Sequence, residues 1–278
     1  MSQTAASPSL PTIAFIGGGN MASAIIGGLI HQGQPASQIE VVEPWAEARE
    51  ALRKNYGIEA QAEAGPALQR AGIVVWAVKP QTFKDAAAQA KAHTQAALHL
   101  SVAAGIRSDS IAQWLGSERV VRTMPNTPAL VGKGMSALYA RPAVTAAERQ
   151  SVEAIMASTG EFLWVESEKQ LDAVTALSGS GPAYVFYFLE AMTRAGVGMG
   201  LSEAQAHQLA VGTFVGASEL ARRSDEPPAM LRQRVTSKGG TTYAALQSME
   251  ADGVGGAFER AMQAACQRAD ELGNEFGA

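Results

Sequence analysis

Short apolar segments alternate with helical patterns from Thr12 to Val165, and this alternation limits the possible folds of the chain more than any other feature. A repeated strand–helix–strand order predicts a doubly wound parallel α/β sheet with helices on both faces. Strands as continuously apolar as Ile73–Val78 fit a sheet buried on both sides. The predicted strands are Thr12–Ile16, Ile39–Val42, Ile73–Val78, Leu98–Val102, Val120–Met124, Met135–Tyr139 and Phe162–Val165, and the predicted helices between them are Asn20–His31, Trp45–Tyr56, Thr82–His93 and Thr145–Thr159.

After Ser167 the strand signal ends, and the rest of the chain is predicted to be all helical. The sequence Ser178–Pro182 predicts a helix break, and Ser202 with Gln205 has the spacing of a capping box. The predicted helices are Ala183–Ala195, Ser202–Arg223, a shorter one opened by Pro227-Pro228, Thr242–Glu250 and Gly256–Leu272. We therefore predict a tail at 1–11, a sheet domain at 12–167 and a helical domain at 168–278 that associates with a second copy of itself.

The composition is that of a folded chain, with 47% apolar and 17% charged residues. The 22 basic and 26 acidic residues leave a net charge of −4, so there is no basic surface of the kind that binds nucleic acid. A single cysteine, Cys266, excludes a disulfide framework and a multi-cysteine metal site, which predicts a cytoplasmic location. The four histidines have no ligand spacing, and we expect no metal.

No Lys, Arg, Asp or Glu precedes Glu40, so the N-terminal stretch resembles an export signal or a membrane span at first sight. A signal peptide needs a basic region ahead of its apolar core, and Ser2–Ser9 contains no basic residue. A span needs about 20 mainly apolar residues, whereas Gly17–Ala22 interrupts this stretch. A buried strand, a glycine turn and a helix explain the absence of charge better.

The segment Gly17-Gly-Gly19-Asn-Met-Ala22 matches the dinucleotide-binding pattern G-x-G-x-x-G/A, between the first predicted strand and the first predicted helix. Gly17 permits the tight turn, Gly19 lets the backbone approach a pyrophosphate, and Ala22 lets helix and strand pack closely. The phosphates are then expected at the helix N-terminus, where unpaired N–H groups favour negative charge. The motif predicts a bound NAD or NADP, although such a turn can also be purely structural.

Glu43 stands at the end of the second predicted strand, where an acid holds the adenosine ribose 2′-hydroxyl in NAD enzymes. Its charge repels the 2′-phosphate of NADP and so favours NAD. Arg49 and Arg53 on the next helix are expected to weaken this preference for NAD. The alternative is a solvated loop glutamate ahead of Pro44. We expect NADH to be accepted and leave NADPH open.

Three further turns follow the predicted strands at Ala77–Pro80, Ser101–Gly105 and Met124–Pro128. The carboxyl ends of parallel strands are where open α/β sheets bind their ligands. Together these small-residue turns predict a groove for a flat ring, although each alone is no more than a turn.

Four segments carry a more specific match. They are Phe15–Ala22, Ala77–Pro80, Arg122–Pro128, and a C-terminal signature that runs from Leu177–Tyr184 to Ser237–Thr242. With these motifs the chain resembles the pyrroline-5-carboxylate reductase family over nearly its whole length. The resemblance implies a Rossmann domain, a helical domain that interlocks with that of a second subunit, and a homodimer or a ring of dimers. It also implies the last step of proline biosynthesis, in which NADPH or NADH reduces the cyclic imine 1-pyrroline-5-carboxylate.

The glycine motif, the position of Glu43 and the resemblance together give the expected site residues. Those expected to bind the cofactor are Ile16, Gly17, Gly18, Gly19, Asn20, Met21, Glu43, Ala77, Val78, Lys79, Pro80, Ala103 and Ala104. Those expected to bind the substrate are Glu168, Ser237, Gly240, Thr241 and Thr242. The chain departs from the family pattern at Lys238, where the family usually has Pro, and at Gly72, where an Asp often precedes the strand. Glu43 stands where members that prefer NADP tend to have small or basic residues, and this leaves the cofactor preference open.

Reduction of an iminium needs little acid help, because the positive nitrogen draws the hydride to the adjacent carbon. The cofactor supplies the difficult step and the protein supplies orientation. Gly239–Thr241 at a helix start offers donors for a carboxylate, and the Thr242 hydroxyl is the expected catalytic partner of the ring nitrogen. The alternative is that Thr241 and Thr242 only cap the helix.

Two other functions fit part of this sequence. A β-hydroxyacid dehydrogenase also joins a Rossmann domain to helices, but the catalytic Lys of that class is missing from Gly179–Tyr187. A sensor or scaffold that binds NAD(P)H without turnover is the alternative outside the enzymes, and an assay of cofactor oxidation discriminates it.

Overall fold

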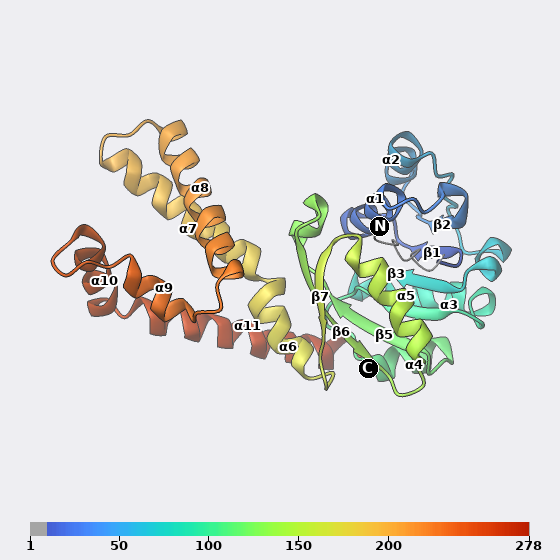
Figure 1. Cartoon of the computed structure of the whole chain (residues 1–278). Helices are drawn as coiled ribbons and strands as arrows, with labels where there is room; N and C mark the ends of the chain where they lie inside the picture. Colours follow the sequence, from blue (N-terminus) through green and yellow to red (C-terminus); the bar gives the residue numbers. More distant parts are fainter. Residues whose placement is uncertain (1–9, 278) are drawn as a thin grey trace, which may run out of the picture. The chain divides into compact units, whose positions relative to one another are not determined.

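A computed structural model of the chain describes residues 10–277, and Figure 1 shows its elements. Two compact units are present, one formed by residues up to Ser180 and from Ala265 onward, the other by Gly181–Ala264. The tail predicted at 1–11 lies outside the described residues except for its last two positions. The domain boundary predicted at 167/168 stays a prediction.

The first unit contains a seven-stranded sheet in the order β2-β1-β3-β4-β5-β6-β7. Its strands are β1 (Ile13–Ile16), β2 (Ile39–Val42), β3 (Ile73–Trp76), β4 (Leu98–Ser101), β5 (Val120–Met124), β6 (Gly134–Ala140) and β7 (Gly160–Trp164). A strand lies at each of the seven predicted positions, so the prediction is confirmed. Short apolar runs are a strong strand signal in a sequence.

One strand pair departs from the predicted parallel sheet. β5 and β6 are antiparallel, whereas the other neighbouring pairs are parallel. The connection from β5 to β6 contains only the short 3-10 helix Thr127–Val131. A parallel return needs a crossover of a dozen or more residues, so this short connection turns the chain back antiparallel.

The helices of the first unit also follow the prediction, with two exceptions. They are α1 (Asn20–His31), α2 (Ala46–Tyr56), α3 (Pro80–Ala90), α4 (Ser108–Leu115), α5 (Ala146–Ala157), α6 (Gln170–Val174) and the last part of α11 (Val254–Phe276). No helix was predicted at α4 or at α6, which are only eight and five residues long. Thr145 and Glu148 form the reciprocal capping box at the start of α5.

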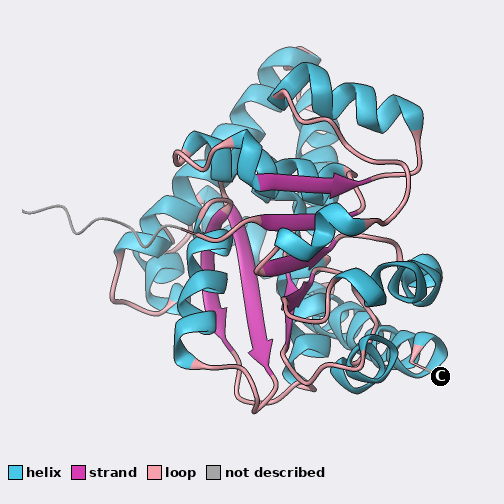
Figure 2. Ribbon diagram, turned by 90° about the vertical axis from the view of Figure 1, so that its right-hand side faces the viewer, coloured by secondary structure: helices cyan, strands magenta, loops and turns pink. Residues whose placement is uncertain are grey.

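Two apolar cores lie on opposite faces of the sheet. Ile13 and Phe15 of β1 pack with residues of α1, α2 and α5, and Ala14 and Ile16 pack with residues of α3 and α4. This alternation is the two-residue period of a strand whose two sides are both buried. Figure 2 shows the strands, in magenta, between cyan helices. The double winding predicted from the sequence is confirmed.

The second unit is helical. Its elements are α7 (Gly181–Gly198), α8 (Glu203–Arg223), α9 (Pro228–Arg234), α10 (Thr241–Ala251) and the first part of α11. The capping box predicted at Ser202 is confirmed at the start of α8. The predicted helix break falls at Ser180, between a π-helical turn at Thr175–Gly179 and α7.

Within residues 10–277, no helix combines the length and apolar character needed to cross a membrane. No group of three or more His, Cys, Asp or Glu side chains in the same range is arranged to hold a metal ion.

His99 of β4 is buried inside the sheet, with 1% of its surface exposed. The Trp76 indole donates a hydrogen bond to His99 Nδ1 at 3.2 Å, which requires this nitrogen to be unprotonated. Burial, with a smaller contribution from the charge of Arg119, lowers the pKa of His99 to about 4.

This burial predicts a loss of stability in acid. Between pH 6.5 and 4 the unfolded chain protonates His99 more readily than the folded chain does, so the free energy of unfolding falls as the pH falls. One such group contributes at most about 1.4 kcal/mol per pH unit. Urea unfolding across this range measures the slope, and His99→Gln is expected to reduce it whereas the exposed control His31→Gln leaves it unchanged. An equal slope in the parent and His99→Gln contradicts the assignment.

Candidate active site

The turn between β1 and α1 requires glycine at Gly17. Its φ of +97° lies in the left-handed region, and a Cβ atom there would stand 2.6 Å from the Ala77 carbonyl oxygen. Its N–H donates to the Val42 carbonyl at 2.8 Å, so the turn is fixed between the ends of β2 and β3. A Cβ atom at Gly19, in contrast, would meet no atom within 4 Å. The tight turn predicted at Gly17 is confirmed, and Gly19 is the glycine that leaves space above the backbone.

The N-terminus of α1 lacks a side-chain cap. Gly19 is the N-cap residue, no side chain accepts a hydrogen bond there, and the first turn contains no acidic residue. The first N–H groups of a helix have no partner inside the helix. With the positive end of the helix dipole, these groups can bind an anion such as a pyrophosphate. Asn20 and Met21 begin this helix.

Glu43 is buried, with 5% of its surface exposed. Its carboxylate accepts hydrogen bonds from the Gly18 N–H at 2.7 Å and from the Trp45 N–H at 2.9 Å. The alternative of a solvated loop glutamate is therefore wrong, because two backbone donors hold this carboxylate against the glycine turn. A carboxylate has about four acceptor positions, so these two bonds leave capacity for a further donor such as a ribose hydroxyl. The ribose contact itself stays a prediction.

The two arginines expected near Glu43 have different surroundings. Arg49 Nη1 donates to the carbonyls of Glu43 at 2.9 Å and Pro44 at 2.7 Å. Arg53 instead forms a two-pronged exposed pair with Glu50. Arg49 is therefore the cation that lies beside the Glu43 backbone, and Arg53 is held by its neighbour on α2.

A cleft of about 580 Å³ opens over the glycine turn. Of the predicted cofactor residues, it is lined by Ile16, Gly17, Gly19, Glu43, Ala77, Val78 and Lys79. Gly18, Asn20, Met21, Pro80, Ala103 and Ala104 are not among its lining residues. Other lining residues include Trp45, Ala62, Ala64, Thr82, Asp85 and Gln89. Sequence reasoning missed these, because small or polar residues on helices and loops carry no motif. The one signal in the sequence was Trp45, an aromatic residue only two positions after Glu43.

Ala103 and Ala104 follow β4. Ala103 is buried, and its N–H donates to Ser101 Oγ at 3.3 Å. The next residue, Gly105, has a φ of +73° and turns the chain toward α4. Their predicted role beside the nicotinamide stays a prediction.

Glu168 belongs to a polar network inside the first unit. Its carboxylate accepts hydrogen bonds from Arg122 Nη1 at 2.6 Å, from the Ser108 N–H at 2.5 Å and from Ser108 Oγ at 2.6 Å. Arg122 is only 5% exposed. Burial lowers the pKa of Arg122, and the charge of Glu168 opposes that shift. Arginine stays protonated in proteins, so Glu168 compensates a buried cation. The substrate contact predicted for Glu168 stays a prediction.

Asn126 connects two of the motifs. Its amide nitrogen donates to the Ser178 carbonyl at 3.1 Å, and its amide oxygen accepts from the Met135 N–H at 2.9 Å. The turn after β5 is thereby tied to the π-helical turn that precedes α7. At Gly179 a Cβ atom would lie 2.5 Å from the Met124 side chain, which explains a glycine in this segment. Asn126 lies inside the motif Arg122–Pro128, but its role as a connector was not predicted.

The remaining predicted residues, Ser237 and Gly240–Thr242, lie in the second unit, where a turn leads into α10. Gly239 has a φ of +75°, and the Gly240 N–H donates to the Ser237 carbonyl at 3.0 Å. Gly240 is the N-cap of α10, and no side chain caps the helix. The alternative that the two threonines only cap the helix is therefore wrong, because both lie inside its first turn. Both are exposed.

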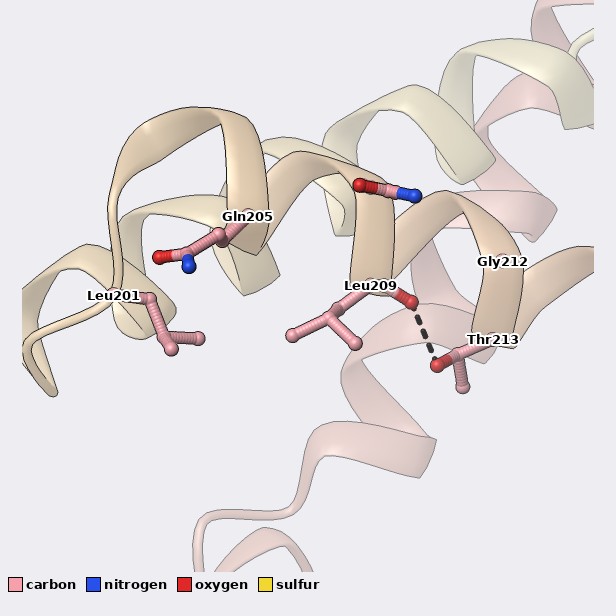
Figure 3. A pocket seen from close by; sticks show the side chains of 6 residues that line it. Leu201, Gln205, Leu209, Gly212 and Thr213 are labelled. Carbon is pink, nitrogen blue, oxygen red and sulfur yellow. Dashed lines mark hydrogen bonds between the residues drawn. The ribbon is translucent and has the colours of Figure 1, made fainter.

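The second unit exposes many large apolar side chains, among them Phe186 (58%), Met199 (79%) and Leu209 (59%). A groove of about 530 Å³ runs along the start of α8 and is lined by Leu201, Gln205, Gln208, Leu209, Gly212 and Thr213. Figure 3 shows these side chains from close by. Exposed apolar patches of this kind are typical of surfaces that a partner covers. Tyr184 and Phe188 instead pack against Phe258 inside the unit.

Comparison with known proteins places both parts of the chain. Residues 168–272 match the family model described as pyrroline-5-carboxylate reductase dimerisation, and residues 12–105 match the model described as NADP oxidoreductase coenzyme F420-dependent. The pyrroline-5-carboxylate reductase of Pseudomonas aeruginosa is 46% identical over 97% of this chain and 99% of its own length. That of Haemophilus influenzae is 40% identical over 95% of this chain and 98% of its own.

Two solved structures share the fold over most of their length. The pyrroline-5-carboxylate reductase of Coxiella burnetii has a TM-score of 0.87 at 36% identity, covering 95% of this chain and 98% of its own. The pyrroline carboxylate reductase of Plasmodium falciparum, solved with NADP bound, has a TM-score of 0.86 at 29% identity, covering 95% of this chain and 99% of its own. Together with the glycine turn and the uncapped start of α10, these matches show that the chain belongs to the pyrroline-5-carboxylate reductase family.

Proposed function

We propose that this protein reduces 1-pyrroline-5-carboxylate to proline, with hydride supplied by NADH or NADPH. The observation that carries the proposal is the turn Gly17–Gly19, with its uncapped helix behind it and the cleft above it. A volume of about 580 Å³ lies within the range of small-molecule sites, roughly 300–1,000 Å³. Membership of the reductase family supports the choice of substrate.

When bound, the dinucleotide supplies the hydride, and the residues of the first unit hold it. The N–H groups at the start of α1 bind its pyrophosphate, which the open space at Gly19 lets approach the backbone. The Glu43 carboxylate accepts a hydrogen bond from the adenosine ribose. Ala77, Val78 and Lys79 lie along the cleft, with Lys79 as its cation.

The residues around Gly240 hold the substrate in this proposal. The uncapped N–H groups of the first turn of α10 bind the substrate carboxylate, for the same reason that helix N-termini bind other anions. The Thr242 hydroxyl lies in that turn and contacts the ring nitrogen. A hydroxyl is a weak acid near neutral pH, so Thr242 orients the ring and relays a proton rather than providing one unaided.

We also propose a homo-oligomer of at least two copies in the cytoplasm. The match of residues 168–272 to a dimerisation model and the exposed apolar side chains of the second unit support association. Cys266, without a disulfide partner, supports a reducing compartment.

The cofactor preference tests the role of Glu43. The parent is expected to use NADH at least as well as NADPH, and Glu43→Gln is expected to shift the ratio of kcat/KM toward NADPH by about fivefold or more. The reason is that removing a charge about 4 Å from a phosphate removes at least about 1 kcal/mol of repulsion. Steady-state kinetics with 1-pyrroline-5-carboxylate and each cofactor measure the ratio.

Glu47→Gln is the matched control, because it removes the same charge from an exposed residue in the first turn of α2. Its ratio should stay that of the parent. A parent that strongly prefers NADPH contradicts the assignment of Glu43.

A further inference from the structure

Trp45 is the most exposed tryptophan of the chain. Its surface is 72% exposed, whereas Trp76 is fully buried and Trp114 and Trp164 are partly buried. Among the described residues, no other ring stacks on its indole. An indole combines a large apolar face with a polar N–H edge, which is why tryptophan is enriched at binding interfaces.

The position of Trp45 links it to the cofactor cleft. It lines the same cleft as Gly17 and Glu43, and it is the N-cap residue of α2. Its backbone is held by the hydrogen bond from its N–H to Glu43 Oε1 at 2.9 Å. The Arg49 guanidinium, one turn along α2, donates hydrogen bonds to the carbonyls of Glu43 and Pro44, the two residues before Trp45. The backbone at Trp45 is therefore held in place, which lowers the conformational entropy lost when a ligand binds the side chain.

The chemistry of a nucleoside indicates what lies on this indole. Glu43 is the residue proposed to hold the ribose 2′-hydroxyl, and the base is bonded to the neighbouring ribose carbon. A base attached there reaches the wall of the cleft beside Glu43, where Trp45 offers a flat π-surface. The other residues that line the cleft, among them Pro44, Ala48, Ala62 and Ala64, carry no aromatic ring, so Trp45 is the one stacking surface there.

We infer that Trp45 is the platform on which the adenine ring of the dinucleotide stacks, and that it determines affinity for the adenosine half of the cofactor. This inference rests on the proposed function, because it takes the cleft to be the dinucleotide site. Stacking of a base on an aromatic side chain contributes about fivefold to 150-fold in affinity.

The test separates the two halves of the cofactor. Isothermal titration calorimetry of the full chain measures the Kd of ADP-ribose, which contains the adenine, and of reduced nicotinamide mononucleotide, which does not. Trp45→Ala is expected to raise the Kd of ADP-ribose at least about fivefold and to leave that of the mononucleotide unchanged. Trp45→Phe, which keeps a ring, is expected to recover most of the affinity.

A spectroscopic measurement supplements the affinities. ADP-ribose is expected to quench the tryptophan fluorescence of the parent and of the control Trp164→Phe, but not that of Trp45→Phe. Trp164 is the matched control because its indole bonds Glu153 and lies under Arg149, and it does not line the cleft.

The outcomes are distinct. If the parent and Trp45→Ala bind ADP-ribose with the same Kd, the platform is overturned and the proposed function still stands. The platform is also overturned if Trp45→Ala dissociates the oligomer in sedimentation velocity while its Kd for ADP-ribose is unchanged, since Trp45 is then a contact between copies. A parent that binds neither ADP-ribose nor NADH overturns the proposed function as well.

Discussion

Glu168→Ala is expected to lower the free energy of unfolding by about 3–5 kcal/mol, the usual cost of removing one partner of a buried ion pair. Arg122 is 5% exposed, and the Glu168 carboxylate is its ion-pair partner. The same carboxylate also accepts the Ser108 N–H at the start of α4. Its removal leaves a buried cation and a helix N-terminus without their acceptor.

Urea unfolding of the parent and variant at neutral pH, followed by circular dichroism, measures this loss. Glu166→Ala is the control, because it removes the same charge from an exposed residue two positions away. It is expected to change the stability by no more than about 0.5 kcal/mol. If Glu168→Ala unfolds like the parent and only its KM for the imine rises, Glu168 contacts the substrate instead of supporting the first unit.

Thr242→Ala is expected to lower kcat by about 100-fold, the scale of a group that assists proton transfer. The affinity for the dinucleotide should change little, because the glycine turn and the cleft lie in the other unit. Thr242→Ser keeps the hydroxyl and is expected to retain most of kcat. Since Thr242 is exposed at the second position of α10, neither change should unfold the chain.

Steady-state kinetics give kcat and KM, and fluorescence titration gives the Kd of NADH. Ser151→Ala of α5 is the control, because its hydroxyl bonds the Ala147 carbonyl of its own helix and lines neither the cofactor cleft nor the groove on α8. A kcat of Thr242→Ala equal to that of the parent removes Thr242 from the chemical step.

Much of the fold was predictable because each strand of the sheet is a short, nearly continuous apolar run. Ile39–Val42 and Val120–Met124 have the predicted bounds, because a polar residue, a charged residue or a proline stands directly outside each end. The direction of β6 was not predictable from its own residues, because it depends on the short connection before it. The helix α4 was missed because eight residues hold too few apolar positions for a clear helical period.

The site was predictable where backbone conformation demands a particular residue. Gly17 has the expected tight turn, because only glycine fits both its φ and the nearby Ala77 carbonyl. The partners of Glu43 and Glu168 could not be predicted, because the Gly18 N–H and the Arg122 guanidinium come from elements distant in the sequence. Such contacts depend on the folded chain and leave no periodic signal.

Oxidation of the cofactor during turnover tests the central claim most directly. The purified chain is mixed with NADH or NADPH and 1-pyrroline-5-carboxylate, absorbance at the ~340 nm band of the reduced nicotinamide is followed, and proline is quantified. The account predicts that absorbance falls only when the imine is present, and that one proline forms for each cofactor oxidised. Tight binding of either cofactor without oxidation or proline would contradict it and would indicate a protein that senses the dinucleotide.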